Sequence, residues 1–248
     1  MYPEYSYPFP TMLQAARDWI LLHQRSFRRD SQACIRRLKP ALRVLGGEDT
    51  LQSGPCLITF NHYYRPGFGA WWLALAATVP VEIHFIMTDE LTFPGKWYGP
   101  LGMFFSHILL ERAARMYGFT PIPPMPPRPQ DVERRAQAVR RVLSYVKATS
   151  HPVLGLAPEG MDMPGGALHW PPEGAGRFLS RLAGQGLPIV PVGCYKEAGE
   201  FCLHFGAAYR LEVWRGTAAE RERESAFQVM TQIARLLPER LRGEFGHR

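Results

Sequence analysis

From Cys56 onward, short apolar runs alternate with helical stretches, and this alternation constrains the fold more than any other feature of the sequence. The segments expected to form strands are CLITF (56–60), VEIHFIMT (81–88), 119–122, PVLGLA (152–157), PIVPVGCY (188–195), 201–205 and 209–214. Helical stretches are expected at 68–78, 97–117, 130–148, 175–184 and 218–241. Strands alternating with helices favour a mostly parallel central sheet flanked by helices, so the predicted fold class is α/β.

The first 50 residues follow a different pattern. Thr11 is expected to cap a helix whose apolar positions lie among arginines. A second helical stretch shows apolar residues at three- and four-residue spacing: Ile35, Leu38, Leu42 and Leu45. The sequence therefore predicts an N-terminal basic amphipathic helical pair in residues 1–50 and an α/β domain over 51–248, together forming one structural unit.

The positive charge is concentrated in the predicted helical pair. Between Thr11 and Gly47 there are eight basic residues and two acidic ones, so this segment carries most of the net charge of +7. Such a segment suggests a polyanionic partner, either nucleic acid or an anionic membrane surface. A solvated helix face explains the same charge equally well.

Length and composition place the chain among ordinary globular proteins. The 248 residues are enough for a full core, and 46% of them are hydrophobic. The four cysteines lack CxxC spacing and no signal peptide precedes them, which favours a reduced, cytoplasmic protein without a zinc site. The longest apolar run, 68–81, is interrupted and too short to span a bilayer, so a membrane-associated form would lie on the surface.

Two loops carry the residues best suited to catalysis or ligand binding. NHYYRPG (61–67) follows the first strand of the alternating region, and APEGMDMPGG (157–166) follows a later one. Since parallel sheets place their sites beyond the carboxyl ends of strands, we expect His62 and Glu159 to lie at the site. Each loop taken alone is weak evidence, because a single histidine in a polar loop is more often structural and Pro-Glu-Gly is commonly a turn.

Taken together and in this order, the motifs resemble those of the glycerolipid acyltransferase family, the glycerol-3-phosphate and 1-acylglycerol-3-phosphate acyltransferases. That family carries Asn-His and then Asp after its first core strand, and NH at 61–62 matches the first two. It also carries a Pro-Glu-Gly motif, which APEGMDM (157–163) keeps, and a Pro-Ile-Val-Pro-Val strand, matched by LPIVPVG (187–193). DELTFPGKWYGPLGMFF (89–105) and GFTPIPPMPPR (118–128) occupy the places of the intervening blocks, and the resemblance spans about residues 55 to 195.

The resemblance implies an acyltransferase that moves a fatty acyl group from acyl-CoA or acyl carrier protein (acyl-ACP) to a glycerolipid-type hydroxyl such as that of a lysophospholipid. His62 would be the general base, since its pKa near 6.5 suits proton removal from a hydroxyl. Substrate binding is expected of Asn61, Arg65, Glu159, Gly160 and Arg128. Arg65 would bind a phosphate through two parallel N–H groups, although the same sequence position is equally compatible with an ordinary surface arginine. No cofactor is expected beyond the acyl donor.

The chain departs from the family where the family has the aspartate that orients the histidine. Gly67 stands there, and in the Ser-His-Asp triad loss of the equivalent carboxylate costs roughly 10⁴ in turnover. Asp162 lies in the facing loop where the family has an arginine, so we interpret the two departures as a relocated charge with Asp162 as the catalytic carboxylate. Glu159, Asp89 and Glu90 are the other candidates.

Two alternatives to a peripheral-membrane enzyme remain. One is a catalytically degenerate lipid-binding relative of the same fold. The other, a nucleic-acid binder, is supported by no recognition motif, so nucleic acid is not an expected partner. A serine hydrolase is disfavoured because the sequence has no GxSxG. Trp71 and Trp72 would flank an acyl-chain groove or simply pack in the core.

Overall fold

The computed structural model describes residues 8–36, 38–39, 41–47, 54–62, 70–91, 99–124, 128–161, 165–212 and 214–246. Its strands are β1 (Leu42–Leu45), β2 (Cys56–Phe60), β3 (His84–Thr88), β4 (Thr120–Ile122), β5 (Val153–Leu156), β6 (Ile189–Glu197) and β7 (Glu200–Phe205). Its α-helices are α1 (Phe9–Leu21), α2 (Phe27–Ile35), α3 (Ala70–Thr78), α4 (Gly99–Tyr117), α5 (Val132–Ala148), α6 (Ala175–Ala183) and α7 (Ala218–Ala234). Short 3₁₀ turns lie at Pro129–Asp131, Glu239–Leu241 and Gly243–Phe245.

The described strands form one seven-stranded sheet in the order β1-β7-β6-β2-β5-β3-β4. All neighbouring pairs are parallel except β6 and β7, which form an antiparallel hairpin. The central strand β2 is buried along its whole length, as expected for a parallel strand covered on both faces. The predicted α/β class is therefore confirmed.

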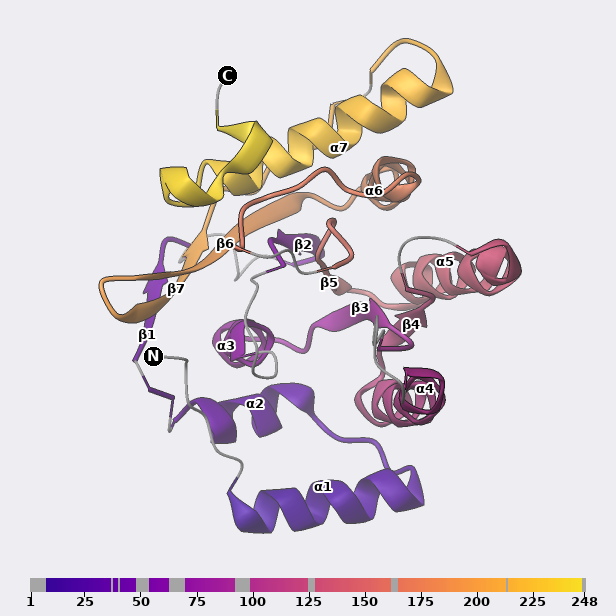
Figure 1. Cartoon of the computed structure of the whole chain (residues 1–248), viewed down its shortest axis with the longest axis vertical. Coiled ribbons are helices and arrows are strands. Elements are labelled where there is room, and N and C mark those ends of the chain that lie inside the picture. The colour runs from indigo at the N-terminus through magenta and orange to yellow at the C-terminus, as the bar shows by residue number, and fades with distance from the viewer. Residues whose placement is uncertain are drawn as a thin grey trace.

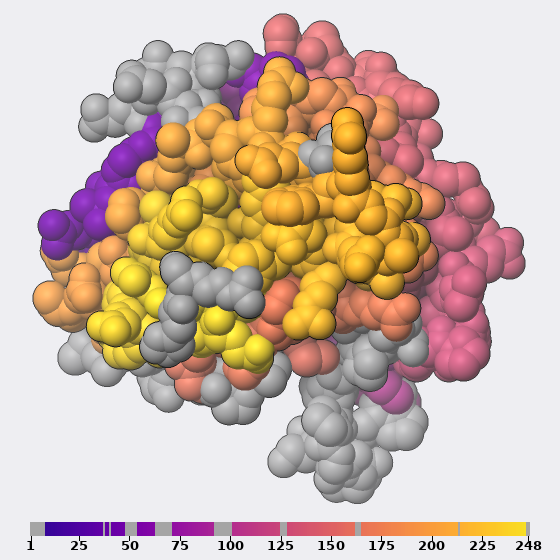
Figure 2. Space-filling view, turned by 90° about the horizontal axis from the view of Figure 1, so that it is seen from above, coloured from indigo at the N-terminus to yellow at the C-terminus, as the bar shows by residue number. Residues whose placement is uncertain are grey.

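Helices cover both faces of the sheet (Figure 1). On one face α2 and α3 pack through an apolar cluster that includes Phe27, Leu73 and Phe85, and α1 lies outside them. On the other face α5, α6 and α7 bury a second cluster that includes Val142, Leu179 and Met230. Seen from the α7 side, the surface is formed largely by α7 and the C-terminal turns (Figure 2). This layering leaves the ends of the strands as the places where polar loops converge.

Two helices are present near the N-terminus, but neither lies where it was expected. α1 begins at Phe9 with Pro8 as its N-cap, so the cap expected of Thr11 is wrong, and Phe27 starts α2 instead of continuing the first helix. The helix expected over 35–45 is wrong, because α2 ends at Ile35 and Leu42–Leu45 forms strand β1. Pro40 lies within the expected helix and lacks the N–H that a helix interior requires. β1 instead pairs with the edge of β7, with Leu42 opposite Phe201, so the first 50 residues contribute a strand to the sheet.

Two expectations near the C-terminus are also corrected. The strand expected over 209–214 is reduced, in the part that the structure describes, to a bridge between Tyr209 and Ile189. The final helix ends at Ala234, and Pro238 precedes a 3₁₀ turn, so the helix does not reach residue 241. The other predicted strands and helices from residue 56 onward are confirmed, with ends that move by a few residues.

Candidate active site

Asn61 extends the sheet by one step beyond the end of β2. Its side-chain Nδ2 donates to the Cys194 carbonyl oxygen at 2.8 Å, and its Oδ1 accepts from the Cys194 N–H at 2.6 Å. The amide thus pairs with both backbone groups of a β6 residue, as a neighbouring strand would. At 1% exposure, Asn61 fixes the point at which the chain leaves the sheet.

His62 follows Asn61 and is attached to the facing loop through its main chain. Its backbone N–H donates to Glu159 Oε2 at 2.7 Å. The imidazole is half-buried and lies 5.5 Å from the Trp71 ring, centroid to centroid. His62 is therefore held between the end of β2, the start of α3 and the loop after β5.

Glu159 joins three segments. It is 5% exposed, and while Oε2 accepts from His62 its Oε1 accepts from the His169 backbone N–H at 3.0 Å. Burial raises the pKa of the Glu159 carboxyl to about 7, and the two N–H donors only partly oppose this. We call the set Asn61, His62, Glu159 and His169, with the Cys194 backbone, the latch.

Gly160 gives the latch its turn. Its φ of 69° lies in the left-handed region that favours glycine, and its N–H donates to the Ala157 carbonyl at 3.2 Å. This tight turn directs the Glu159 side chain back toward the end of β2. The Pro-Glu-Gly motif thus has a structural reason independent of any substrate.

Arg128 lies in a second polar group, at the ends of β3 and β4. Its guanidinium pairs with Glu90 through Nη1 at 2.8 Å and Nη2 at 3.1 Å, and with Asp131 through Nε at 2.5 Å. These carboxylates raise the pKa of Arg128 above its ordinary value. The Arg128 side chain is thereby engaged by protein acids on both edges.

Arg134 completes the second group. It binds Asp131 through Nη1 at 3.2 Å and Asp89 through Nη2. Burial nevertheless raises the pKa of the Asp89 carboxyl, even with Arg134 beside it. We call Asp89, Glu90, Asp131, Arg128 and Arg134 the arginine cluster. Asp89 and Glu90, the two acids at the end of β3 that were candidates to orient His62, are thus paired with arginines of this cluster.

Three sequence-predicted positions lie outside the described residues: Arg65, Gly67 and Asp162. The structure does bring Asn61, His62, Glu159 and Gly160 together, whereas Arg128 belongs to the arginine cluster. The contact of Glu159 with His62 runs to the main chain, and its other oxygen faces His169. His169 was missed by sequence reasoning, since a backbone donor leaves no side-chain signal.

The two tryptophans of α3 have different surroundings. Trp71 packs on Phe60 at 5.0 Å and, as noted, near His62. Trp72 packs on Phe27 at 4.6 Å within the aromatic core. Trp72 therefore serves the core, while Trp71 forms one wall beside the candidate base.

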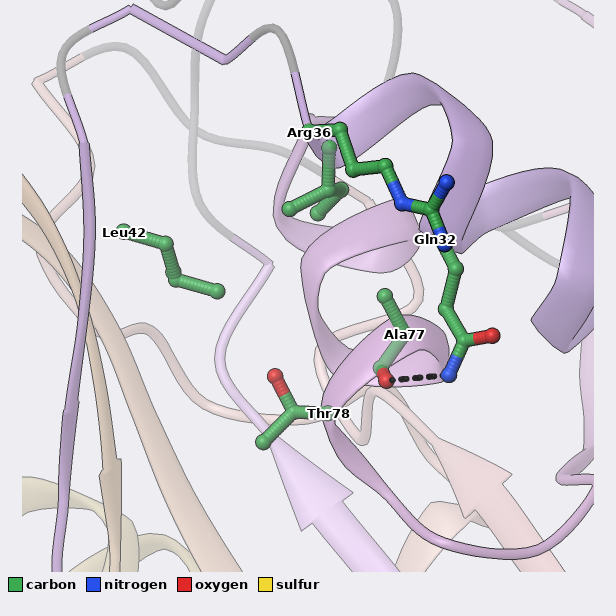
Figure 3. Close-up of a pocket in the computed structure, with 6 residues that line it drawn as sticks. Gln32, Arg36, Leu42, Ala77 and Thr78 are labelled. Atoms are coloured by element: carbon green, nitrogen blue, oxygen red, sulfur yellow. Dashed lines mark hydrogen bonds between the residues drawn. The ribbon is translucent and has the colours of Figure 1, made fainter.

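A cavity of about 420 Å³ lies elsewhere, between α2, β1 and α3 (Figure 3). It is lined by Gln32, Ile35, Arg36, Leu42, Ala77 and Thr78, and Gln32 Nε2 donates to the Ala77 carbonyl across one side at 3.4 Å. None of the latch residues lines it. Within the described residues no group of three His, Cys, Asp or Glu is placed to hold a metal ion.

Fold and latch together define an α/β protein that holds one histidine beyond the carboxyl end of its central strand. A family model described as Acyltransferase matches residues 41–195, more than half of the chain, so the chain belongs to the acyltransferase family. This confirms the resemblance that the motifs indicate. No curated protein sequence matches the chain.

The fold is similar to that of a solved relative. The crystal structure of the 1-acyl-sn-glycerophosphate (LPA) acyltransferase PlsC from Thermotoga maritima superposes with a TM-score of 0.51. The match covers 85% of this chain and 78% of that one at 12% sequence identity. At that identity the comparison shows similarity of fold alone.

Proposed function

We propose that the protein transfers a fatty acyl group from an acyl-CoA or acyl-ACP thioester to a hydroxyl of a glycerolipid-type acceptor such as a lysophospholipid. The observation that carries this proposal is the latch. It places the half-buried His62 at the end of the central strand of an acyltransferase-family fold. The name of the Thermotoga maritima protein, an LPA acyltransferase, supports the choice of acceptor class.

The reaction needs one base and a site for a developing oxyanion. The acceptor hydroxyl attacks the thioester carbonyl carbon while the His62 imidazole takes its proton. The tetrahedral intermediate then collapses, the C–S bond breaks, and the imidazolium returns the proton to the leaving thiolate. The backbone N–H of His62 is engaged by Glu159, so the donors for the oxyanion come from other groups of the loop or the start of α3.

The test compares wild type with His62→Ala in detergent, with acyl-CoA as donor and lysophosphatidic acid as acceptor. Since general-base catalysis contributes about 10²–10⁴ in rate, His62→Ala is expected to lose activity by roughly that factor. His151→Ala, an exposed histidine just before β5, is the matched control and keeps the wild-type rate. Equal rates for wild type and His62→Ala would contradict the enzymatic proposal and favour the non-catalytic lipid-binding relative, which Gly67 in the aspartate position also favours.

Asp162 is the proposed orienting acid. Replacing it with Asn is expected to lower turnover by up to about 10⁴, as in the Ser-His-Asp triad, with little change in substrate affinity. If Asp162→Asn keeps full activity while His62→Ala is inactive, the assignment of Asp162 as the orienting acid is wrong, although the assignment of His62 as the base stands.

The proposed setting is an anionic membrane surface. The basic N-terminal segment supports this, with Arg29 and Arg36 exposed on and after α2. Among the described residues no helix combines the length and apolar character needed to cross a bilayer. Peripheral binding is therefore the form of membrane association that we propose.

A further inference from the structure

Helix α1 presents its apolar side to solvent. Of its six large apolar residues, Trp19 is half-buried, and Phe9, Met12, Leu13, Ile20 and Leu21 are between 47% and 65% exposed. Within α1, which is fully described, the one buried residue is Asp18. A surface helix ordinarily buries its apolar stripe and exposes its charges, so α1 is inverted.

A buried ion network fixes α1 in this orientation. Asp18 Oδ2 accepts from Arg25 Nη1 at 2.6 Å, and Arg25 Nη2 donates to Asp30 Oδ1 at 2.7 Å. Tyr117, at the end of α4, donates its hydroxyl to Asp30 at 2.9 Å. Hydrogen bonds from Arg25 and Arg17 lower the pKa of Asp18, so the network stays charged at neutral pH. The outward apolar face is thus a consequence of specific contacts among α1, α2 and α4.

Helix α4 carries a second outward stripe. Leu101, Phe104, Phe105, Ile108 and Leu109 recur at helical spacing and are between 39% and 60% exposed. The inner side of the same helix buries Ser106, Ala114 and Met116. Five large apolar side chains on one helical face exceed what scattered surface residues explain.

Helices α1 and α4 contact each other through Arg112. Arg112 of α4 donates through Nη2 to the Ile20 carbonyl at the end of α1 at 3.0 Å, and its guanidinium stacks over Trp19 at 4.7 Å. Arg112 lies one helical turn beyond Ile108. α1 and α4 lie on the same side of the sheet, α1 outside α2 and α4 beside β4 (Figure 1). We call the ten exposed apolar residues of α1 and α4 the two-helix face.

Charge around the two-helix face indicates the occupant. Residues 9–36 and 99–117 contain seven arginines and three carboxylates. Two of those carboxylates, Asp18 and Asp30, are consumed in the buried network. The third carboxylate, Glu111, pairs with the exposed Arg115 at 3.5 Å, and Arg29 is exposed as well. An apolar face on segments of net positive charge matches the boundary between acyl chains and anionic headgroups.

We propose that the two-helix face docks the protein on an anionic lipid surface, with α4 as an insertion element in its own right alongside the N-terminal helix. This inference rests on the proposed function for its choice of partner. It goes beyond it by placing five contact residues in α4, about 80 positions after α1.

The experiment measures vesicle binding by flotation, with phosphatidylcholine vesicles that contain phosphatidylglycerol. The variant Phe104→Gln/Phe105→Gln removes two exposed rings and is expected to bind at least about tenfold more weakly, because burying two aromatic side chains contributes more than that factor. The control Val81→Gln/Val132→Gln replaces two apolar residues that are 46% and 67% exposed elsewhere, and is expected to bind as wild type does. Pure phosphatidylcholine vesicles are expected to retain less wild-type protein.

Each other outcome overturns the proposal. Unchanged vesicle binding by the α4 variant removes α4 from the docking surface. If wild type is a dimer by light scattering and the α4 variant is a monomer with unchanged vesicle binding, the face is covered by a second copy. Because flotation requires no turnover, it separates failed docking from failed catalysis, and both variants are expected to keep the wild-type rate on detergent-dispersed acceptor.

Discussion

The latch and the arginine cluster are two polar groups at strand ends, and they bury carboxylates in opposite ways. Glu159 is held by two backbone N–H groups, whereas Glu90 and Asp131 are held by arginine side chains. Backbone donors give geometry without a compensating full charge, so burial raises the pKa of Glu159 to about 7. Arginines give charge, but in doing so they lose the capacity to meet a substrate anion.

This difference suits the latch to positioning His62, and it leaves the arginines of the arginine cluster unsuited to recognising a substrate anion. The latch uses short polar side chains to hold a loop whose histidine remains at a half-buried position. The arginine cluster joins the end of β3 to the start of α5 through Asp89 and Arg134. A phosphate contact by Arg128 would require Glu90 and Asp131 to give up their pairing.

The largest expected effect falls on Asn61, the anchor of the latch. Asn61→Ala leaves the Cys194 N–H and carbonyl without side-chain partners, at about 1–3 kcal/mol each, so we expect about 4 kcal/mol lower stability by urea unfolding. Asn61→Asp is the matched variant, because it still accepts from the N–H but cannot donate to the carbonyl. Loss of less than about 1 kcal/mol in Asn61→Ala would show that the latch is not anchored in β6.

The second-largest expected effect is a dependence of stability on pH that comes from the ionisation of Glu159. Its folded pKa of about 7 lies above the ordinary 4.5, so between these values the folded state binds more protons than the unfolded state. Wild type should therefore lose stability as pH rises from 4.5 to 7, by at most about 3 kcal/mol, and change little through this group above that. Subtracting the unfolding curve of Glu159→Gln, measured at each pH, isolates this slope. Parallel curves for the two proteins would mean that Glu159 titrates normally.

Asp131 tests the arginine cluster. Asp131→Asn leaves Arg128 and Arg134 without one carboxylate, and because both arginines are partly exposed we expect about 2 kcal/mol of destabilisation, below the range for a fully buried pair. Added salt should reduce this difference. Glu133→Gln, an exposed acid on the next turn, is the control and should change stability by less than about 0.5 kcal/mol.

The smallest effect is expected from Arg128 on substrate affinity. Since its guanidinium is engaged by protein acids, Arg128→Met should leave the KM for lysophosphatidic acid within about threefold, whereas Arg65→Met, if Arg65 meets the phosphate, should raise it roughly 10–100-fold. Steady-state kinetics on both variants measure the contrast. A large KM increase in Arg128→Met alone would return the phosphate contact to the arginine cluster.

Sequence reading located the latch by its motifs but not by its bonds. His62 and Glu159 are singled out because they follow apolar strands, whose ends converge in a parallel sheet, and Asn61 because the Asn-His pair resembles that of the family. The link from Glu159 to the His62 and His169 N–H groups could not be read, because backbone donors are the same at every residue. Arg128 is assigned from the resemblance, because 118–128 occupies the place of a family block, while its pairing with Glu90 and Asp131 follows from the packing of the fold.

The N-terminal segment shows the same limit for secondary structure. Three- and four-residue apolar spacing over 35–45 predicted a helix, yet Leu42–Leu45 pairs with β7. A free strand edge offers backbone hydrogen bonds that local apolar periodicity does not reveal. A short apolar run is therefore compatible with either a helix or a strand.

By itself the sequence determined the α/β class, the order of most elements, and the histidine and glutamate loops, because these depend on apolar periodicity and local turn chemistry. Tertiary structure alone decided which way α1 faces, which arginines are neutralised and which N–H groups the Glu159 carboxylate meets. Those outcomes depend on pairs of groups far apart in the chain, such as Asn61 with Cys194 and Arg112 with Ile20. Their contact energies exist only once the sheet has brought the partners together.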